Sequence, residues 1–110
     1  MTLEDVKTQI TRMPTIMSAE QEIQVFRSLM QVPVEALTNK WKDLDFVMSR
    51  LCESHSDTFY EVSDKNRSSF LEFSDWLDRV APGFDERRRA SLMQAAEHFR
   101  IDPSSVEGSR

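Results

Sequence analysis

The stretch from Val34 to Val80 constrains the fold of this 110-residue chain most strongly, because it contains neither proline nor glycine. Apolar side chains recur along it at a mean spacing of about 3.5 residues, the period of helices that pack as coiled coils. Only His55 and Asn66 interrupt the resulting apolar face. The pattern therefore predicts one continuous helix over 34–80, about 70 Å long at about 1.5 Å per residue.

The sequence also leaves room for a break in this helix near residues 63–68. The segment "SDKNRSS" at 63–69 is rich in residues that compete with the helical backbone for hydrogen bonds. Ser69 and Glu72 have the spacing of a capping box, which would start a new helix there. The continuous helix keeps its apolar phase across this segment, whereas a break would give a compact four-helix bundle.

Two shorter helices are expected before this stretch. Thr2 with Asp5 resembles an N-terminal cap for the first helix. Ser18 and Gln21 form a capping box, because the hydroxyl and the amide can each satisfy a free backbone donor of the other residue. A second helix is therefore expected over about 19–31.

One more helix is expected after the long stretch. "APGF" at 81–84 predicts a turn, since proline and glycine together interrupt regular structure. Asp85 can then cap a last helix over about 86–100. We expect residues 1–100 to form one helical bundle and the polar segment 101–110 to be a disordered tail.

Charge and composition exclude several classes of protein. The 14 basic and 19 acidic side chains give a net charge of −5 without a basic face, so nucleic acid is not an expected partner. Cys52 is the only cysteine, so no intrachain disulfide can form. No apolar run approaches the roughly 20 residues that cross a bilayer, and no secretory signal is recognisable. We expect a cytoplasmic protein without membrane insertion.

Both tryptophans lie in segments with a recognisable pattern. Trp41 stands in "LTNKWKDL" and Trp76 in "FLEFSDWL". These segments resemble the spectrin repeat, the helical module of spectrin, dystrophin, plectin and the nesprins. There, a third helix with tryptophan and leucine continues into the first helix of the next repeat. The resemblance covers about 34–80 and implies an all-α, spectrin-like antiparallel helical bundle with a long central helix, either one module or a fragment spanning a repeat junction. The residues expected to define this fold are Leu37, Trp41, Leu44, Phe70, Phe73, Trp76 and Leu77.

The resemblance implies a structural or scaffold module of a cytoskeleton-associated protein that mediates protein–protein interaction. Its partners would be other proteins or neighbouring repeats. A long apolar face such as that of 34–80 must be covered, so we also expect the isolated chain to self-associate. The alternative function is that of a compact helical adaptor or regulatory protein that binds one protein partner.

Catalysis and metal binding find little support. Cys52 and His55 lie three residues apart and could supply two metal ligands or a nucleophile and a base. A structural zinc needs about four ligands, and no oxyanion-stabilising group accompanies the pair. Neither glycine belongs to a phosphate-binding loop. We therefore expect no enzyme activity, no metal and no cofactor.

One short motif points to regulation. In "ERRRAS" Arg88 and Arg89 precede Ser91 by three and two residues. The pattern resembles the substrates of basophilic protein kinases, which makes Ser91 a candidate phosphorylation site. The alternative is a basic turn exposed to solvent.

Overall fold

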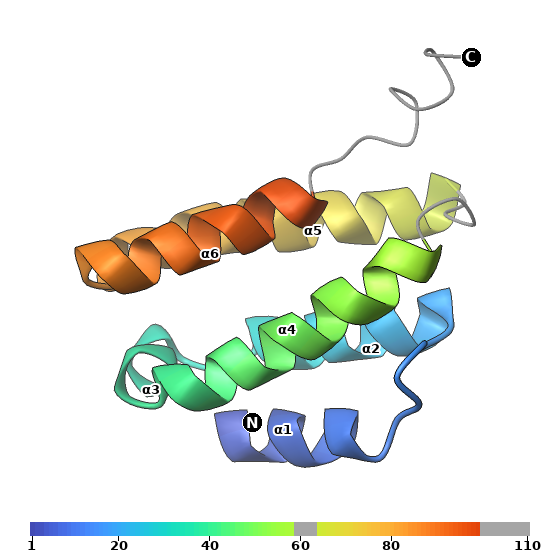
Figure 1. The fold of residues 1–110 in the computed structure, drawn as a ribbon, viewed down its shortest axis with the longest axis horizontal. Coiled ribbons are helices and arrows are strands. Elements are labelled where there is room, and N and C mark those ends of the chain that lie inside the picture. Colours follow the sequence, from blue (N-terminus) through green and yellow to red (C-terminus); the bar gives the residue numbers. More distant parts are fainter. Residues whose placement is uncertain (59–63, 100–110) are drawn as a thin grey trace.

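The computed structural model describes the backbone of residues 1–58 and 64–99 and the side chains of residues 1–54 and 68–98. Every regular element within these ranges is helical, so the predicted all-α fold is confirmed. The helices pack together as a compact bundle (Figure 1). In chain order they are α1 (Leu3–Thr11), α2 (Ala19–Met30), α3 (Val34–Asn39), α4 (Trp41–Thr58), α5 (Asp64–Val80), the 3₁₀ turn η2 (Ala81–Gly83) and α6 (Glu86–Phe99).

The first two helices begin where local sequence signals predict them. The Thr2 hydroxyl accepts the backbone N–H of Asp5 at 3.2 Å, and the Asp5 carboxylate accepts the backbone N–H of Thr2 at 3.1 Å. Ser18 and Gln21 form the same reciprocal pair at 3.2 and 2.9 Å. Both predicted caps are confirmed, because each depends only on residues three positions apart.

The predicted continuous helix over 34–80 is wrong, and the chain first leaves the helical path at Lys40. The backbone angles of Lys40, φ −120° and ψ 45°, are not helical, so α3 ends at Asn39 and α4 begins at Trp41. An asparagine at a helix end competes with the backbone for hydrogen bonds and favours such a break. The Lys40 carbonyl then accepts the backbone N–H of Asp43 at 3.0 Å and opens the first turn of α4.

A second separation lies between α4 and α5. The two helices run in opposite directions, and both contact α2 and α6 (Figure 1). Residues 59–63 between them lie outside the described residues. The chain is therefore folded back on itself rather than extended, and its extents of 43 × 30 × 19 Å exclude a 70 Å rod.

The alternative, a break that gives a compact bundle, is confirmed in part: the chain does fold back on itself, but the break excludes residues 64–68. Residues 64–68 belong to α5, which begins at Asp64. Ser69 and Glu72 lie inside this helix, so the capping box predicted from them is wrong. A serine can occupy a helix interior when the tertiary packing of the helix outweighs its weak intrinsic preference.

One apolar core holds the helices together. Helix α1 packs on α4 and α2, α5 packs on α2 and α6, and α6 also packs on α4. Phe26 of α2 lies at the centre, stacked on Phe73 of α5 with 4.4 Å between ring centroids. Phe70 meets the same ring edge-on at 5.3 Å. Six of the seven residues expected to define the fold are buried, namely Leu37, Leu44, Phe70, Phe73, Trp76 and Leu77, whereas Trp41 is only partly buried.

Buried polar contacts attach the segment between α1 and α2 to α4. The Ser54 hydroxyl accepts the backbone N–H of Met17 at 2.8 Å and donates to the Glu22 carboxylate at 2.9 Å. Arg50 donates to the carbonyls of Ile10 and Met13 at 3.2 and 3.1 Å, at and just after the end of α1. These contacts fix α1 and α2 on one side of α4, so its other side faces α6.

The turn into α6 is held by its arginines. The Asp85 carboxylate accepts the backbone N–H of Arg88 at 2.9 Å, as predicted for the cap of this helix. The Arg89 guanidinium donates to the carbonyls of Ala81 and Phe84 at 3.3 and 3.1 Å. Arg89 therefore anchors the turn from which α6 begins. The predicted tail, 101–110, lies outside the described residues.

Within the described part of the chain, no helix combines the length and the apolar character needed to cross a membrane.

Candidate functional site

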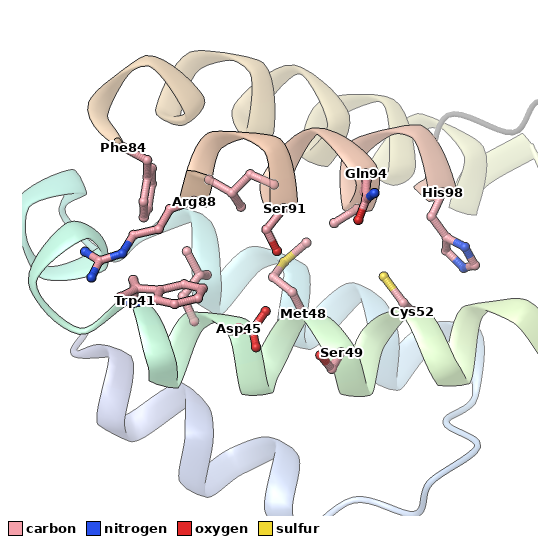
Figure 2. A pocket seen from close by; sticks show the side chains of 13 residues that line it. Trp41, Asp45, Met48, Ser49, Cys52, Phe84, Arg88, Ser91, Gln94 and His98 are labelled. Carbon is pink, nitrogen blue, oxygen red and sulfur yellow. The ribbon is translucent and has the colours of Figure 1, made fainter. Parts of the chain in front are cut away.

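A groove lies between α4 and α6 on the described surface. Both helices run in the same direction along it, with Trp41 and Arg88 at one end and Cys52 and His98 at the other (Figure 2). Its volume is about 260 Å³. The rise from Trp41 to Cys52 along α4 makes the groove about 16 Å long.

The groove has an apolar floor and polar rims. Leu44 and Met48 of α4 and Leu92 of α6 form the floor, and each is at most 7% exposed. These positions follow from helical periodicity, because residues three or four apart share one face. The rims carry polar side chains: Asp45 and Ser49 on α4, and Ser91 and Gln94 on α6.

The Trp41 end of the groove is built from aromatic rings and an arginine. Phe84, from the turn before α6, is buried beside the groove. The Arg88 guanidinium lies over the Trp41 indole at 4.9 Å from the ring centroid. Its Nε lies 3.4 Å from the Asp85 carboxylate. A planar guanidinium stacked on indole and paired with a carboxylate is held in one orientation.

Cys52 and His98 form the other end of the groove. Burial disfavours the charged thiolate and raises the pKa of the Cys52 thiol from its ordinary value of 9.0 to about 11. A thiol with a raised pKa is a poor nucleophile at neutral pH. Cys52 therefore contributes to the groove as a small apolar group.

We expect the Cys52 thiol to react about tenfold more slowly with a disulfide reagent in the folded protein than in urea near pH 8. The raised pKa leaves about a hundredth of the thiolate, and the greater nucleophilicity of a more basic thiolate offsets part of that loss. Because the pKa is higher in the folded state, the contribution of Cys52 to stability is fully present below about pH 9. It is lost as the pH rises toward about 11. The reaction rate of the thiol, measured against pH in buffer and in urea, gives its pKa in the folded and the unfolded state. These two pKa values check both statements. Equal rates in the two solvents would show that the thiol is not shielded.

The structure brings only some of the predicted residues to this groove. Trp41, Leu44 and Ser91 line it, whereas the phenylalanines and Trp76 of α5 lie in the core. Ser91 is exposed on the second turn of α6, and its predicted phosphorylation stays a prediction. Arg88 and Arg89, expected as kinase recognition residues, both contact the protein itself. The side chain of His55 lies outside the described residues.

Sequence patterns did not indicate Phe84, Arg88 or His98 as parts of one site with Trp41. The available signal was the apolar stripe of α6, including Leu92 and Ala96, which both turn out to be buried. That stripe predicts which face of α6 is covered, but not which helix covers it.

No group of three or more metal-ligating side chains is found among the residues whose side chains are described. The groove combines an apolar floor, the partly buried Trp41 and the Arg88 guanidinium over its ring. Comparisons with protein-family models, curated proteins and solved structures return no match to this chain.

Proposed function

We propose that this chain is a compact helical adaptor that binds one protein partner through the groove between α4 and α6. The observation that carries the proposal is the partly exposed Trp41, stacked with Arg88 at the end of an apolar floor. Tryptophan and arginine are enriched among the residues that dominate binding energies at protein interfaces. Elsewhere in the described chain the large aromatic side chains of α2 and α5 are buried and serve the core.

The size of the groove favours a protein partner. Sites for drug-sized ligands enclose about 300–1,000 Å³, and this groove lies just below that range at about 260 Å³. It can accept one or two large apolar side chains of a partner. Because it is open along about 16 Å between two parallel helices, a helical segment of about three turns matches its length.

The scaffold function implied by the resemblance to spectrin repeats is less well supported. It depends on a long helix that continues from one repeat into the next, and this chain is folded back within extents of 43 × 30 × 19 Å. The expected self-association depended partly on Phe70 and Phe73, and both are buried within the chain. Phe59 and Val62, which belong to the same apolar face of 34–80, lie outside the residues whose side chains are described. A compact adaptor is expected to be a monomer when free.

Blocking the groove should prevent the partner from binding to the chain. Ser91→Trp places a large ring into the groove from α6, and Ser49→Trp does so from α4. Tagged wild-type chain and both variants, recovered after cross-linking in the cells that express the protein, are compared by quantitative mass spectrometry. We expect one protein to be at least tenfold depleted with either blocked variant, because truncating or occluding an interface hot spot costs about 2 kcal/mol or more.

Ala90→Trp is the matched control, because Ala90 is exposed on α6 beside Ser91 but does not line the groove. It should recover the same protein as the wild type. Circular dichroism and sedimentation equilibrium confirm that all variants are folded and have the same mass. If both blocked variants recover the same proteins as the wild type in the same amounts, the groove is not the binding surface and the proposal fails.

A further inference from the structure

Arg88 is held in a position that leaves its outer edge free for a ligand. Its Nε faces the Asp85 carboxylate at 3.4 Å, and its plane lies over Trp41. Among the residues that the structure describes, no hydrogen bond is found for its two terminal amino groups. In Figure 2 the guanidinium points away from Cys52 and His98 and out of the Trp41 end of the groove. A guanidinium fixed by stacking and by its Nε can offer its terminal amino groups to a carboxylate at little entropic cost.

A second hollow adjoins the groove at this end. Its walls include Trp41 and Arg88 together with Lys42 and Arg87. Lys42 and Arg87 are exposed, and no ion pair is found for either within the described part of the chain. Three cationic residues, Lys42, Arg87 and Arg88, therefore line this hollow.

Two carboxylates also line this second hollow, and their contacts decide whether it attracts an anion. Asp85 is engaged twice, with the backbone N–H of Arg88 and with the Arg88 Nε. Glu86 is exposed in the first turn of α6, where the helix dipole favours a negative charge and the side chain is hydrated. Once Asp85 is paired with Arg88, the lining has two further cations, Lys42 and Arg87, and one further carboxylate, Glu86, so the hollow favours an incoming anion.

We infer that the partner segment carries an acidic side chain directly beside its apolar anchor. The anchor occupies the floor formed by Leu44, Met48 and Leu92, and the carboxylate pairs with the terminal amino groups of Arg88. Trp41 separates the two subsites and contributes to both. This inference rests on the proposed function, because it specifies the partner of the same groove. A carboxylate is the ligand of choice for an arginine fork, since two parallel hydrogen bonds can form.

Two peptide-display libraries test the inference. Both contain random peptides with aromatic and aliphatic residues; one includes Asp and Glu but no Lys or Arg, and the other includes Lys and Arg but no Asp or Glu. Each library is selected on the wild-type chain and counter-selected on Ser91→Trp, so that only groove-dependent peptides remain. We expect groove-dependent peptides from the acidic library alone, with an acidic residue next to a large apolar one.

The outcomes separate this inference from the proposed function. Groove-dependent peptides from the basic library, or equally from both libraries, would overturn the acidic partner and leave the docking groove standing. Absence of groove-dependent peptides from both libraries would overturn both.

Arg88→Met then tests the role assigned to the guanidinium. Methionine keeps an unbranched chain over Trp41 but removes the charge and the donors. Peptides from the acidic library should bind it about tenfold more weakly, and replacing their acidic residue by its amide should have no further effect. Arg27→Met, on the exposed face of α2, is the matched control and should bind as the wild type does. Equal binding by Arg88→Met and wild type, with both folded by circular dichroism, would show that Arg88 does not receive the carboxylate.

Discussion

Replacing Phe73 by alanine is expected to lower the free energy of unfolding by about 3–5 kcal/mol, the usual cost of removing a buried phenylalanine. Phe73 has no exposed surface and lies between two other rings. Its centroid is 4.4 Å from that of Phe26 and 5.4 Å from that of Trp76, both in stacked arrangements. The substitution leaves a cavity between α2 and α5, which cannot close without moving one of these helices. Urea unfolding followed by circular dichroism measures the loss.

Phe46→Ala is the matched control for this variant. Phe46 is 38% exposed on α4, and its one described ring contact is with the Lys7 ammonium, 5.5 Å from its centroid. Loss of an exposed cation–π contact and of some apolar surface should cost less than about 1.5 kcal/mol. Equal losses for the two variants would contradict the ring stack as the centre of the core.

Ser54→Ala is expected to cost about 2–4 kcal/mol, although it removes a single oxygen atom. The Ser54 hydroxyl accepts a hydrogen bond from the backbone N–H of Met17 and donates one to the Glu22 carboxylate at the same time. Both partners are buried, so removing the hydroxyl leaves one donor and one acceptor without it, away from water. Leaving the Met17 N–H unpaired costs about 1–3 kcal/mol, and the loss of one hydrogen bond by the Glu22 carboxylate adds to this. Chemical denaturation of the variant against the wild type gives the difference.

Ser49→Ala separates this effect from the general cost of changing a serine in α4. Ser49 is exposed on the same helix, and alanine has the higher helix propensity. We expect its stability to lie within about 0.5 kcal/mol of the wild type. A Ser54→Ala variant as stable as Ser49→Ala would show that the three-residue contact does not hold the segment before α2 on α4.

Features whose causes lie within a few residues could be predicted from the amino-acid sequence. The capping pairs Thr2–Asp5 and Ser18–Gln21 were predictable because each donor and acceptor belong to one helix turn. The turn at 81–84 and the cap at Asp85 follow from proline, glycine and aspartate chemistry. Helical periodicity also indicated that the residues later found in the core share a face of their helix.

The pairing of these faces depends on contacts between distant parts of the chain. A spacing of about 3.5 residues shows that Leu44 and Met48 lie on a covered face, but it is satisfied equally by a long rod and by helices folded back on one another. The chain folds back because Phe26 of α2 can then contact Phe70 and Phe73 of α5 together. No local pattern encodes that meeting, since its energy comes from apolar surface contributed by distant parts of the chain.

The candidate site illustrates the same limit. Trp41 occupies an apolar position in the helical pattern of 34–80, so the periodicity predicts that it is buried. In the structure it lies at the edge of the core, under Arg88. Its exposure results from the break at Lys40 and from the register in which α6 packs on α4. Local sequence fixes which side chains are apolar. The packing of two helices about 40 residues apart determines which of them remain accessible to a partner.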